Sequence, residues 1–110
     1  MNGKLADKKC VPCEGGTPPM KGEDIQKNKS QLKNDWKVID DTKIRHEFKF
    51  KDFKQAMAFV NKAADVAEEE GHHPDIHIHY NRVIIELWTH SIGGLSENDF
   101  IMAAKIERLV

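Results

Sequence analysis

The sequence predicts an α+β fold of two layers, in which three helices lie on one face of a four-stranded antiparallel sheet. Two stretches alternate apolar and polar residues around a short polar turn, a pattern typical of half-buried hairpins. Three further stretches favour helix, through their composition or through apolar residues at helical spacing. Because hairpins need no crossover connections, helices on a single face suffice to bury the apolar side of the sheet. The expected order of elements is αββαββα.

The chain is expected to divide into a tail and one domain. Residues 1–20 hold Cys10, Cys13 and several glycines and prolines but almost no large apolar side chains, so we expect a flexible N-terminal tail. Residues 21–110 are expected to form one domain, since a chain of 110 residues supports a single hydrophobic core. At its start, residues 21–33 favour a first helix with few apolar anchors.

A hairpin and a long helix follow the first helix. Residues 36–39 are apolar, residues 44–50 place apolar side chains at every second position, and the polar residues between them indicate a turn. Asp52, followed three residues later by Gln55, resembles a capping box that begins a helix. Apolar residues then repeat at helical spacing as far as Gly71, so this helix is predicted to reach that residue.

The last part of the chain predicts a second hairpin and a final helix. Residues 76–80 and 83–89 alternate apolar and polar side chains on either side of a short turn at Asn81-Arg82. Ser96 is a good N-cap with Asp99 at the third helical position, and several apolar residues follow. These two segments complete the four strands and three helices.

Charge and hydropathy exclude several kinds of partner. The formal net charge is -1, from 17 basic and 18 acidic residues, so no global field attracts nucleic acid or an anionic membrane. No apolar run approaches the roughly 20 residues needed to cross a bilayer, and the lysine-rich start of the chain is unlike a signal peptide. We therefore expect a cytoplasmic protein with reduced cysteines, and its function must come from a local site.

Histidines are concentrated around the second hairpin. His72 and His73 precede its first strand, His77 and His79 lie within that strand, and His90 ends its second strand. A tight antiparallel hairpin brings its two outer ends together, so His72, His73 and His90 are expected to converge at one end of the sheet. Imidazoles exchange protons near neutral pH, which makes this group a candidate for acid/base catalysis.

The spacing of these residues resembles the signature of the pterin-4a-carbinolamine dehydratases. Five separated elements match in order: Glu68, His72-His73-Pro74, Tyr80, His90 and Asp99. The resemblance extends through residues 48–53 and 94–99 and covers roughly residues 36–109. The family fold that it implies, a four-stranded antiparallel sheet with helices on one face, agrees with the order predicted from periodicity.

The resemblance also implies the site residues and the reaction. His72 and His90 would be the principal acid/base residues. His73 would also be catalytic, since it would help bind and polarise the pterin, and Pro74 would contribute to substrate binding. Glu68 and Asp99 would support the histidines. Gly71 departs from some family members, which carry an acidic side chain at this position.

The implied reaction is dehydration of 4a-hydroxytetrahydrobiopterin to the quinonoid dihydropterin, which recycles the pterin cofactor of aromatic amino-acid hydroxylases such as phenylalanine hydroxylase. It requires no metal and no cofactor in the enzyme. The implied assembly is a homodimer or homotetramer.

Two other kinds of function remain open on the residues alone. His77 and His79 share one strand face and, with the preceding histidines, could form a metal-binding module, although alternation already explains their placement. A non-enzymatic dimerisation or adaptor domain is the second alternative. Cys10 and Cys13 have the spacing of a redox or zinc pair, but the tail lacks the other half of a four-ligand site.

Overall fold

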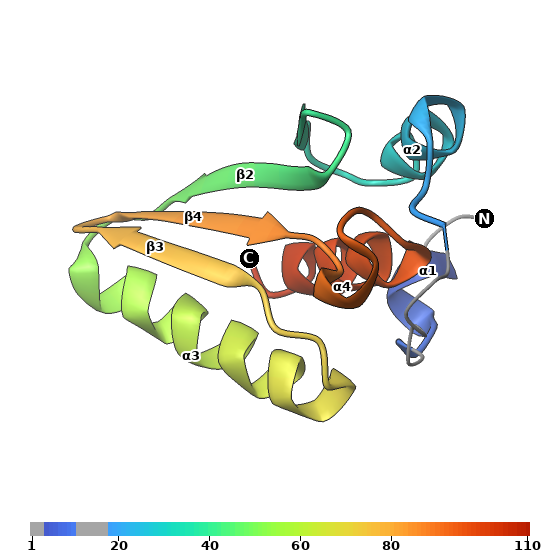
Figure 1. Ribbon diagram of the computed structural model, residues 1–110. Helices are drawn as coiled ribbons and strands as arrows, with labels where there is room; N and C mark the ends of the chain where they lie inside the picture. The colour runs from blue at the N-terminus through green and yellow to red at the C-terminus, as the bar shows by residue number, and fades with distance from the viewer. Residues whose placement is uncertain (1–3, 11–17) are drawn as a thin grey trace.

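The computed structural model describes residues 4–10 and 18–110 and confirms the predicted α+β order (Figure 1). Helix α2 precedes the first hairpin, α3 separates the two hairpins, and α4 ends the chain. Two short elements were not expected, α1 and the 3-10 helix η1. The elements are α1 (Lys4–Asp7), α2 (Gly22–Lys29), β1 (Lys37–Ile39), β2 (Lys43–Lys49), α3 (Phe53–Glu70), β3 (Asp75–His79), β4 (Arg82–Leu87), η1 (His90–Ile92) and α4 (Glu97–Glu107).

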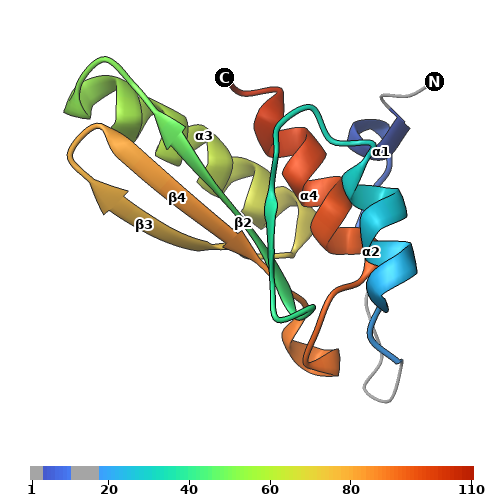
Figure 2. The same cartoon turned by 90° about the horizontal axis from the view of Figure 1, so that it is seen from above.

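The four strands form one antiparallel sheet in the order β1-β2-β4-β3. Each predicted hairpin is present, and the two hairpins join where β2 pairs with β4, from Ile44 opposite Leu87 to Lys49 opposite Arg82. Helices α3 and α4 lie on the same side of the sheet, and α2 lies beside α4 (Figures 1 and 2). Within the part of the chain that the structure describes, no helix covers the opposite face of the sheet.

The core lies between the sheet and these helices. The buried residues of β2 lie on one face of the strand, whereas in β4 Val83, Ile84 and Ile85 are buried in succession. Helix α3 contributes mainly small side chains that let it approach the sheet closely. The buried residues at this interface include Ile44, Phe48, Val83, Ile85, Leu87, Ala56, Phe59, Ala63, Ala67, Phe100, Met102 and Ile106. This burial supplies the main favourable term for folding and fixes the strand register, because a slip of one residue would expose the apolar face.

The ends of α3 are capped by Asp52, through the N-cap bond of the predicted capping box, and by Gly71. The side chain of Asp52 accepts a hydrogen bond of 2.9 Å from the backbone N–H of Gln55, which satisfies a donor in the first turn. Gly71 ends the helix with φ of 66°, a left-handed conformation that a glycine adopts without a steric penalty. This turn directs the next residue, His72, back toward the sheet.

A buried carboxylate connects α4 to the segment that leads into β1. Glu107 accepts hydrogen bonds from the backbone N–H of Lys33 at 2.9 Å, the backbone N–H of Asn34 at 2.7 Å and the indole of Trp36 at 2.8 Å. Glu107 is 7% exposed, so these three donors compensate for the loss of water around its charge. The start of the first hairpin is thereby held against the last helix.

The N-terminal segment has an anchor that the sequence analysis missed. Leu5 in α1 is 3% exposed and belongs to the hydrophobic core, although residues 1–20 were expected to contribute almost nothing to it. Lys105 of α4 also donates a hydrogen bond of 2.9 Å to the backbone oxygen of Ala6. One leucine on a single helical turn gives no periodic signal, so the sequence did not indicate this contact. Cys13 lies outside the described residues.

Candidate active site

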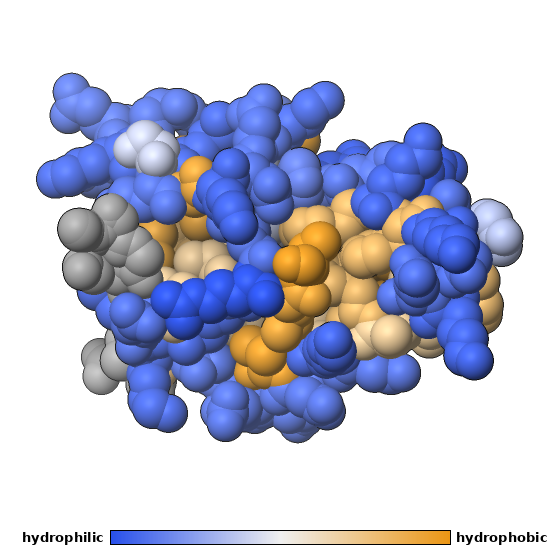
Figure 3. Space-filling model, turned by 180° about the vertical axis from the view of Figure 1, so that it is seen from behind, coloured by the Kyte–Doolittle hydropathy of each residue, from blue (hydrophilic) through white to orange (hydrophobic). Residues whose placement is uncertain are grey.

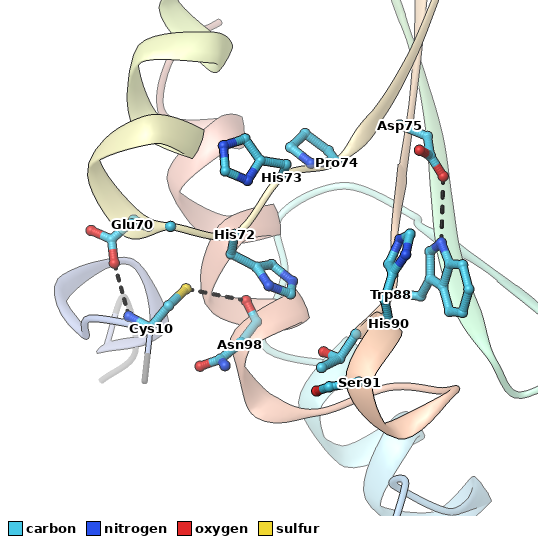
Figure 4. Close-up of a pocket in the computed structure, with 12 residues that line it drawn as sticks. Cys10, Glu70, His72, His73, Pro74, Asp75, Trp88, His90, Ser91 and Asn98 are labelled. Carbon is cyan, nitrogen blue, oxygen red and sulfur yellow. Dashed lines mark hydrogen bonds between the residues drawn. The ribbon is translucent and has the colours of Figure 1, made fainter. Parts of the chain in front are cut away.

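An open pocket of about 600 Å³ lies where the second hairpin meets the end of α3 and the start of α4 (Figure 4). Its volume is in the usual range for sites that bind small molecules. The lining residues are Cys10, Glu70, Gly71, His72, His73, Pro74, Asp75, Trp88, Thr89, His90, Ser91 and Asn98. Four of the six predicted site residues, His72, His73, Pro74 and His90, are therefore brought together around one cavity.

Strand geometry explains why residues far apart in sequence meet here. Strands β3 and β4 are antiparallel, with Asp75 opposite Glu86 at this end of the hairpin. His72 and His73 precede β3, and His90 follows β4, so the register places all three at the same end. The expected convergence of these histidines is confirmed.

Asp99, a fifth predicted site residue, lies behind His72 and is fully buried. Its Oδ1 is 2.7 Å from Nε2 of His72, and its Oδ2 accepts hydrogen bonds from the Thr89 hydroxyl at 2.8 Å and from the Ser96 backbone N–H at 3.0 Å. A carboxylate can only accept, so Nε2 of His72 carries the proton in this bond. In the neutral imidazole, Nδ1 of His72 is then the nitrogen without a proton, and it can accept one.

The Asp99 carboxylate also organises the start of α4. Its bond to the Ser96 N–H completes the predicted capping box. The Thr89 hydroxyl donates to Asp99, so in the 2.7 Å contact between Thr89 and Ser96 it is the Ser96 hydroxyl that donates. Asp99 thus caps α4 and contacts His72 with the same carboxylate.

Glu68, the sixth predicted residue, lies outside the pocket lining. Its carboxylate is 3.2 Å from Nε2 of His73, and both side chains are largely exposed, at 75% and 61%. An ion pair in such contact with water contributes little to stability. Glu68 therefore contacts His73 at the protein surface and does not line the pocket.

His90 is exposed at the edge of the pocket and is held in a different way. Its ring stacks on the indole of Trp88, with centroids 3.9 Å apart and an interplanar angle of 27°. The indole N–H of Trp88 donates to Asp75 at 3.4 Å. Neither Trp88 nor Asp75 was predicted as a site residue. A large aromatic residue directly after β4 and two positions before His90 is a signal that indicates Trp88.

Cys10 forms part of the pocket wall beside these histidines. Its backbone N–H donates to Glu70 at 2.8 Å, and its thiol donates to the backbone oxygen of Asn98 at 3.7 Å (Figure 4). Burial, reinforced by the negative charge of Glu70, raises the pKa of the Cys10 thiol to about 12. The thiol is therefore protonated and weakly nucleophilic at neutral pH.

Glu70 holds Cys10 against the end of α3. The hydrogen bond from the Cys10 N–H is the main cause that lowers the pKa of Glu70, and the ammonium of Lys105, 3.6 Å away, adds to this effect. Glu70 therefore stays ionised and links the N-terminal segment to α4. Helical or strand periodicity could not reveal the contact between Cys10 and Glu70, because these residues are 60 positions apart in the sequence.

His77 and His79 lie on β3, outside the pocket lining. His77 faces Glu86, with Nε2 and Oε1 3.7 Å apart, on the sheet face that carries no helices. Among residues 4–10 and 18–110, no group of three or more histidine, cysteine or acidic side chains is arranged to hold a metal ion. None of the helices within those ranges is long and apolar enough to cross a membrane.

The chain matches the family model for pterin 4 alpha carbinolamine dehydratase over residues 18–109. It belongs to this family. A protein of Alkaliphilus metalliredigens, provisionally named a pterin-4-alpha-carbinolamine dehydratase, is 50% identical over 104 residues, which are 94% of each chain. A protein of Nitrosospira multiformis with the same provisional name is 52% identical over 105 residues, covering 96% of this chain and 91% of that protein.

A solved structure supports the same assignment. The crystal structure of the transcriptional coactivator/pterin dehydratase from Brucella melitensis matches with a TM-score of 0.78 and 36% identity, covering 83% of this chain and 97% of that one. The pterin-4a-carbinolamine dehydratase family, the α+β fold and an enzyme of the hydro-lyase class, each predicted from the sequence, are confirmed. The alignments with the sequence relatives are longer than the segment from residue 18 onward, so they include part of the N-terminal segment.

Proposed function

We propose that this dehydratase removes water from 4a-hydroxytetrahydrobiopterin to give quinonoid dihydropterin, with His72 and His90 exchanging the protons. The observation that carries the proposal is the 2.7 Å contact between His72 and the buried Asp99, in a pocket that His90 also lines. A histidine held by a buried carboxylate has a fixed tautomer and orientation, as proton transfer requires.

His72 is suited to the role of general base. Asp99 holds the proton on Nε2, so Nδ1 is the nitrogen that takes a proton from the pterin ring nitrogen next to C4a. The negative carboxylate then stabilises the positive charge that develops on the imidazole. The side chain of His72 is 13% exposed, so bulk water competes little for this position.

His90 is suited to the role of general acid. It is exposed to the pocket and stacks on Trp88, whose π face favours a positive charge above it. From this position the imidazolium gives a proton to the hydroxyl at C4a. The C–O bond breaks, water leaves, and the electrons of the N–H bond form the new C=N bond.

His73 and Pro74 are assigned to binding the pterin ring, since both line the pocket and neither has a partner as strong as that of His72. Glu68 supports His73 from outside the pocket. The proposed reaction transfers protons and releases water but moves no electrons to another molecule. It therefore needs neither a redox cofactor nor a metal ion.

The proposed role in the cell is recycling of the pterin cofactor used by aromatic amino-acid hydroxylases, including phenylalanine hydroxylation, in the cytoplasm. The quinonoid product is the form that a reductase must return to tetrahydropterin. The proposal rests on the chemistry of the substrate, because a 4a-hydroxypterin is what such a hydroxylase leaves after it transfers one oxygen atom.

We predict that the purified protein accelerates the disappearance of freshly generated 4a-hydroxytetrahydrobiopterin, with and without a chelator. Stopped-flow absorbance measures formation of the quinonoid product against the uncatalysed reaction. Proton transfer by positioned side chains is expected to supply an acceleration of about 10²-fold or more. Activity that a chelator abolishes and zinc restores would instead support the metal-binding alternative.

The division of roles among the histidines gives a second prediction. His72→Ala and His90→Ala should each lower kcat by about 10²-fold or more, whereas His73→Ala should mainly raise KM. His77→Ala is the matched control, because His77 belongs to the same hairpin but lies outside the pocket. Thermal melts must show that all four variants fold, and near wild-type kcat in folded His72→Ala and His90→Ala would refute the assignment.

We also propose that the chain assembles as a homodimer or homotetramer. Strand β1 pairs only with residues 43–45 of β2, which leaves the outer edge of residues 46–49 without a partner strand in the described part of the chain. Figure 3 shows apolar side chains gathered across the middle of one face, and Phe53 and Ile78 are 50% and 39% exposed. Both features favour association of copies.

Light scattering coupled to size exclusion should therefore give a mass of at least twice 12.6 kDa at micromolar concentration. If the exposed Phe53 takes part in the contact, Phe53→Glu should raise the monomer fraction. Lys54→Glu, at the next position of the same helical turn and also exposed, should not. A wild-type mass of a single chain would contradict the proposed assembly.

A further inference from the structure

The two proposed proton-transfer residues differ in how the fold holds them. His72 is fixed by a hydrogen bond to a buried carboxylate, whereas His90 is an exposed residue at the start of η1 whose ring lies against the indole of Trp88. A catalytic imidazole must keep its position to within about 0.5 Å and its orientation to within about 10–20° to transfer a proton efficiently. The ring of His90 therefore needs a support other than a buried carboxylate.

Three elements meet at the indole of Trp88. Asp75, the first residue of β3, accepts the indole N–H at 3.4 Å, and the ammonium of Lys43 in β2 lies 5.9 Å from the indole ring centroid. Trp88 itself follows directly after β4. The indole thus has neighbours from two other strands at the end of the sheet and also stacks with His90.

We propose that Trp88 is the positioning residue for His90, with Asp75 holding the indole in place. This inference rests on the proposed function of His90. Stacking at 3.9 Å with an interplanar angle of 27° restricts rotation of the imidazole relative to the indole. The same face stabilises the imidazolium form, so Trp88 also supports the proton that His90 delivers.

Trp88 can be replaced without dismantling the fold. It is only partly buried and is not a member of the hydrophobic core, in contrast to Trp36, which is fully buried. A Trp88 variant therefore reports on His90 rather than on global folding. Phe is the conservative replacement, since it keeps an aromatic face but loses the N–H that bonds Asp75.

The kinetic test compares Trp88→Ala, Trp88→Phe and the control Tyr80→Ala, which removes an aromatic side chain from the opposite end of the β3–β4 hairpin. We expect Trp88→Ala to lower kcat by about 10-fold or more with little change in KM, in line with the cost of a misplaced catalytic group. Trp88→Phe should recover most of this loss. Asp75→Ala should shift kcat in the same direction by a smaller factor.

A structural readout independent of turnover is the NMR signal of the carbon-bound ring protons of His90, assigned by comparison with His90→Ala. The stacked indole shields these protons, so Trp88→Ala should move them downfield, whereas Tyr80→Ala should leave them in place. The NMR measurement does not depend on turnover. If the wild-type protein is inactive on the pterin, the proposed function is refuted, but the NMR measurement still tests the stack.

Three results would overturn the positioning role. They are wild-type kcat in a folded Trp88→Ala protein, a rise in KM without a fall in kcat, and His90 signals that do not respond to loss of the indole. The second result would mean that the indole binds substrate rather than orienting His90. An unchanged pH profile of kcat in Trp88→Ala would show, as a separate point, that the indole does not support the acid form of His90.

Discussion

Asp99 joins three separate parts of the chain through one buried carboxylate. It caps α4 through Ser96, accepts a hydrogen bond from Thr89 after β4, and accepts another from His72 after α3. A carboxylate taken fully out of water is costly unless its oxygens are satisfied, and breaking such a group by removing a partner typically costs about 3–5 kcal/mol. The end of the sheet, the start of the last helix and the candidate base are therefore parts of one network.

This network explains why the site lies where it does. The α3 helix must end at Gly71 for the chain to turn and place His72 against Asp99, and β3 and β4 must keep their register for His90 to reach the same pocket. The two histidines are then held by different physical means, one by a charge-assisted hydrogen bond and one by an aromatic stack. The hydrogen bond to a carboxylate suits the base proposed for His72, and the stack on an aromatic face suits the acid proposed for His90.

Local patterns were sufficient to predict most of the fold. Alternation in residues 44–50 and 83–89 gave the strands, and the capping residues Asp52 and Ser96 gave the starts of two helices, because these signals operate over a few residues. Hairpin geometry then placed His72 and His90 at one end of the sheet. These predictions succeeded because short-range periodicity and strand direction determine them.

Contacts between distant segments could not be predicted in this way. The burial of Leu5 and the bond from Cys10 to Glu70 depend on how the N-terminal segment meets α3 and α4, and no local spacing encodes that meeting. Similarly, the sequence indicates Asp99 as a helix cap but does not show that its second oxygen meets His72. Trp88 was missed because its role depends on the ring of His90, not on its own strand pattern.

The central claim, that Asp99 makes His72 catalytically competent as well as capping α4, is tested most directly by the kcat of Asp99→Asn. The amide keeps the size of the carboxylate but has an NH2 group in place of one oxygen. If this group faces His72, it needs an unprotonated Nε2, so the proton of His72 moves to Nδ1 and the ring can no longer act as the proposed base. We expect kcat to fall by about 10²-fold or more in a protein that still folds, with the exposed Asp65→Asn as control. Wild-type kcat in a folded Asp99→Asn protein would contradict the account.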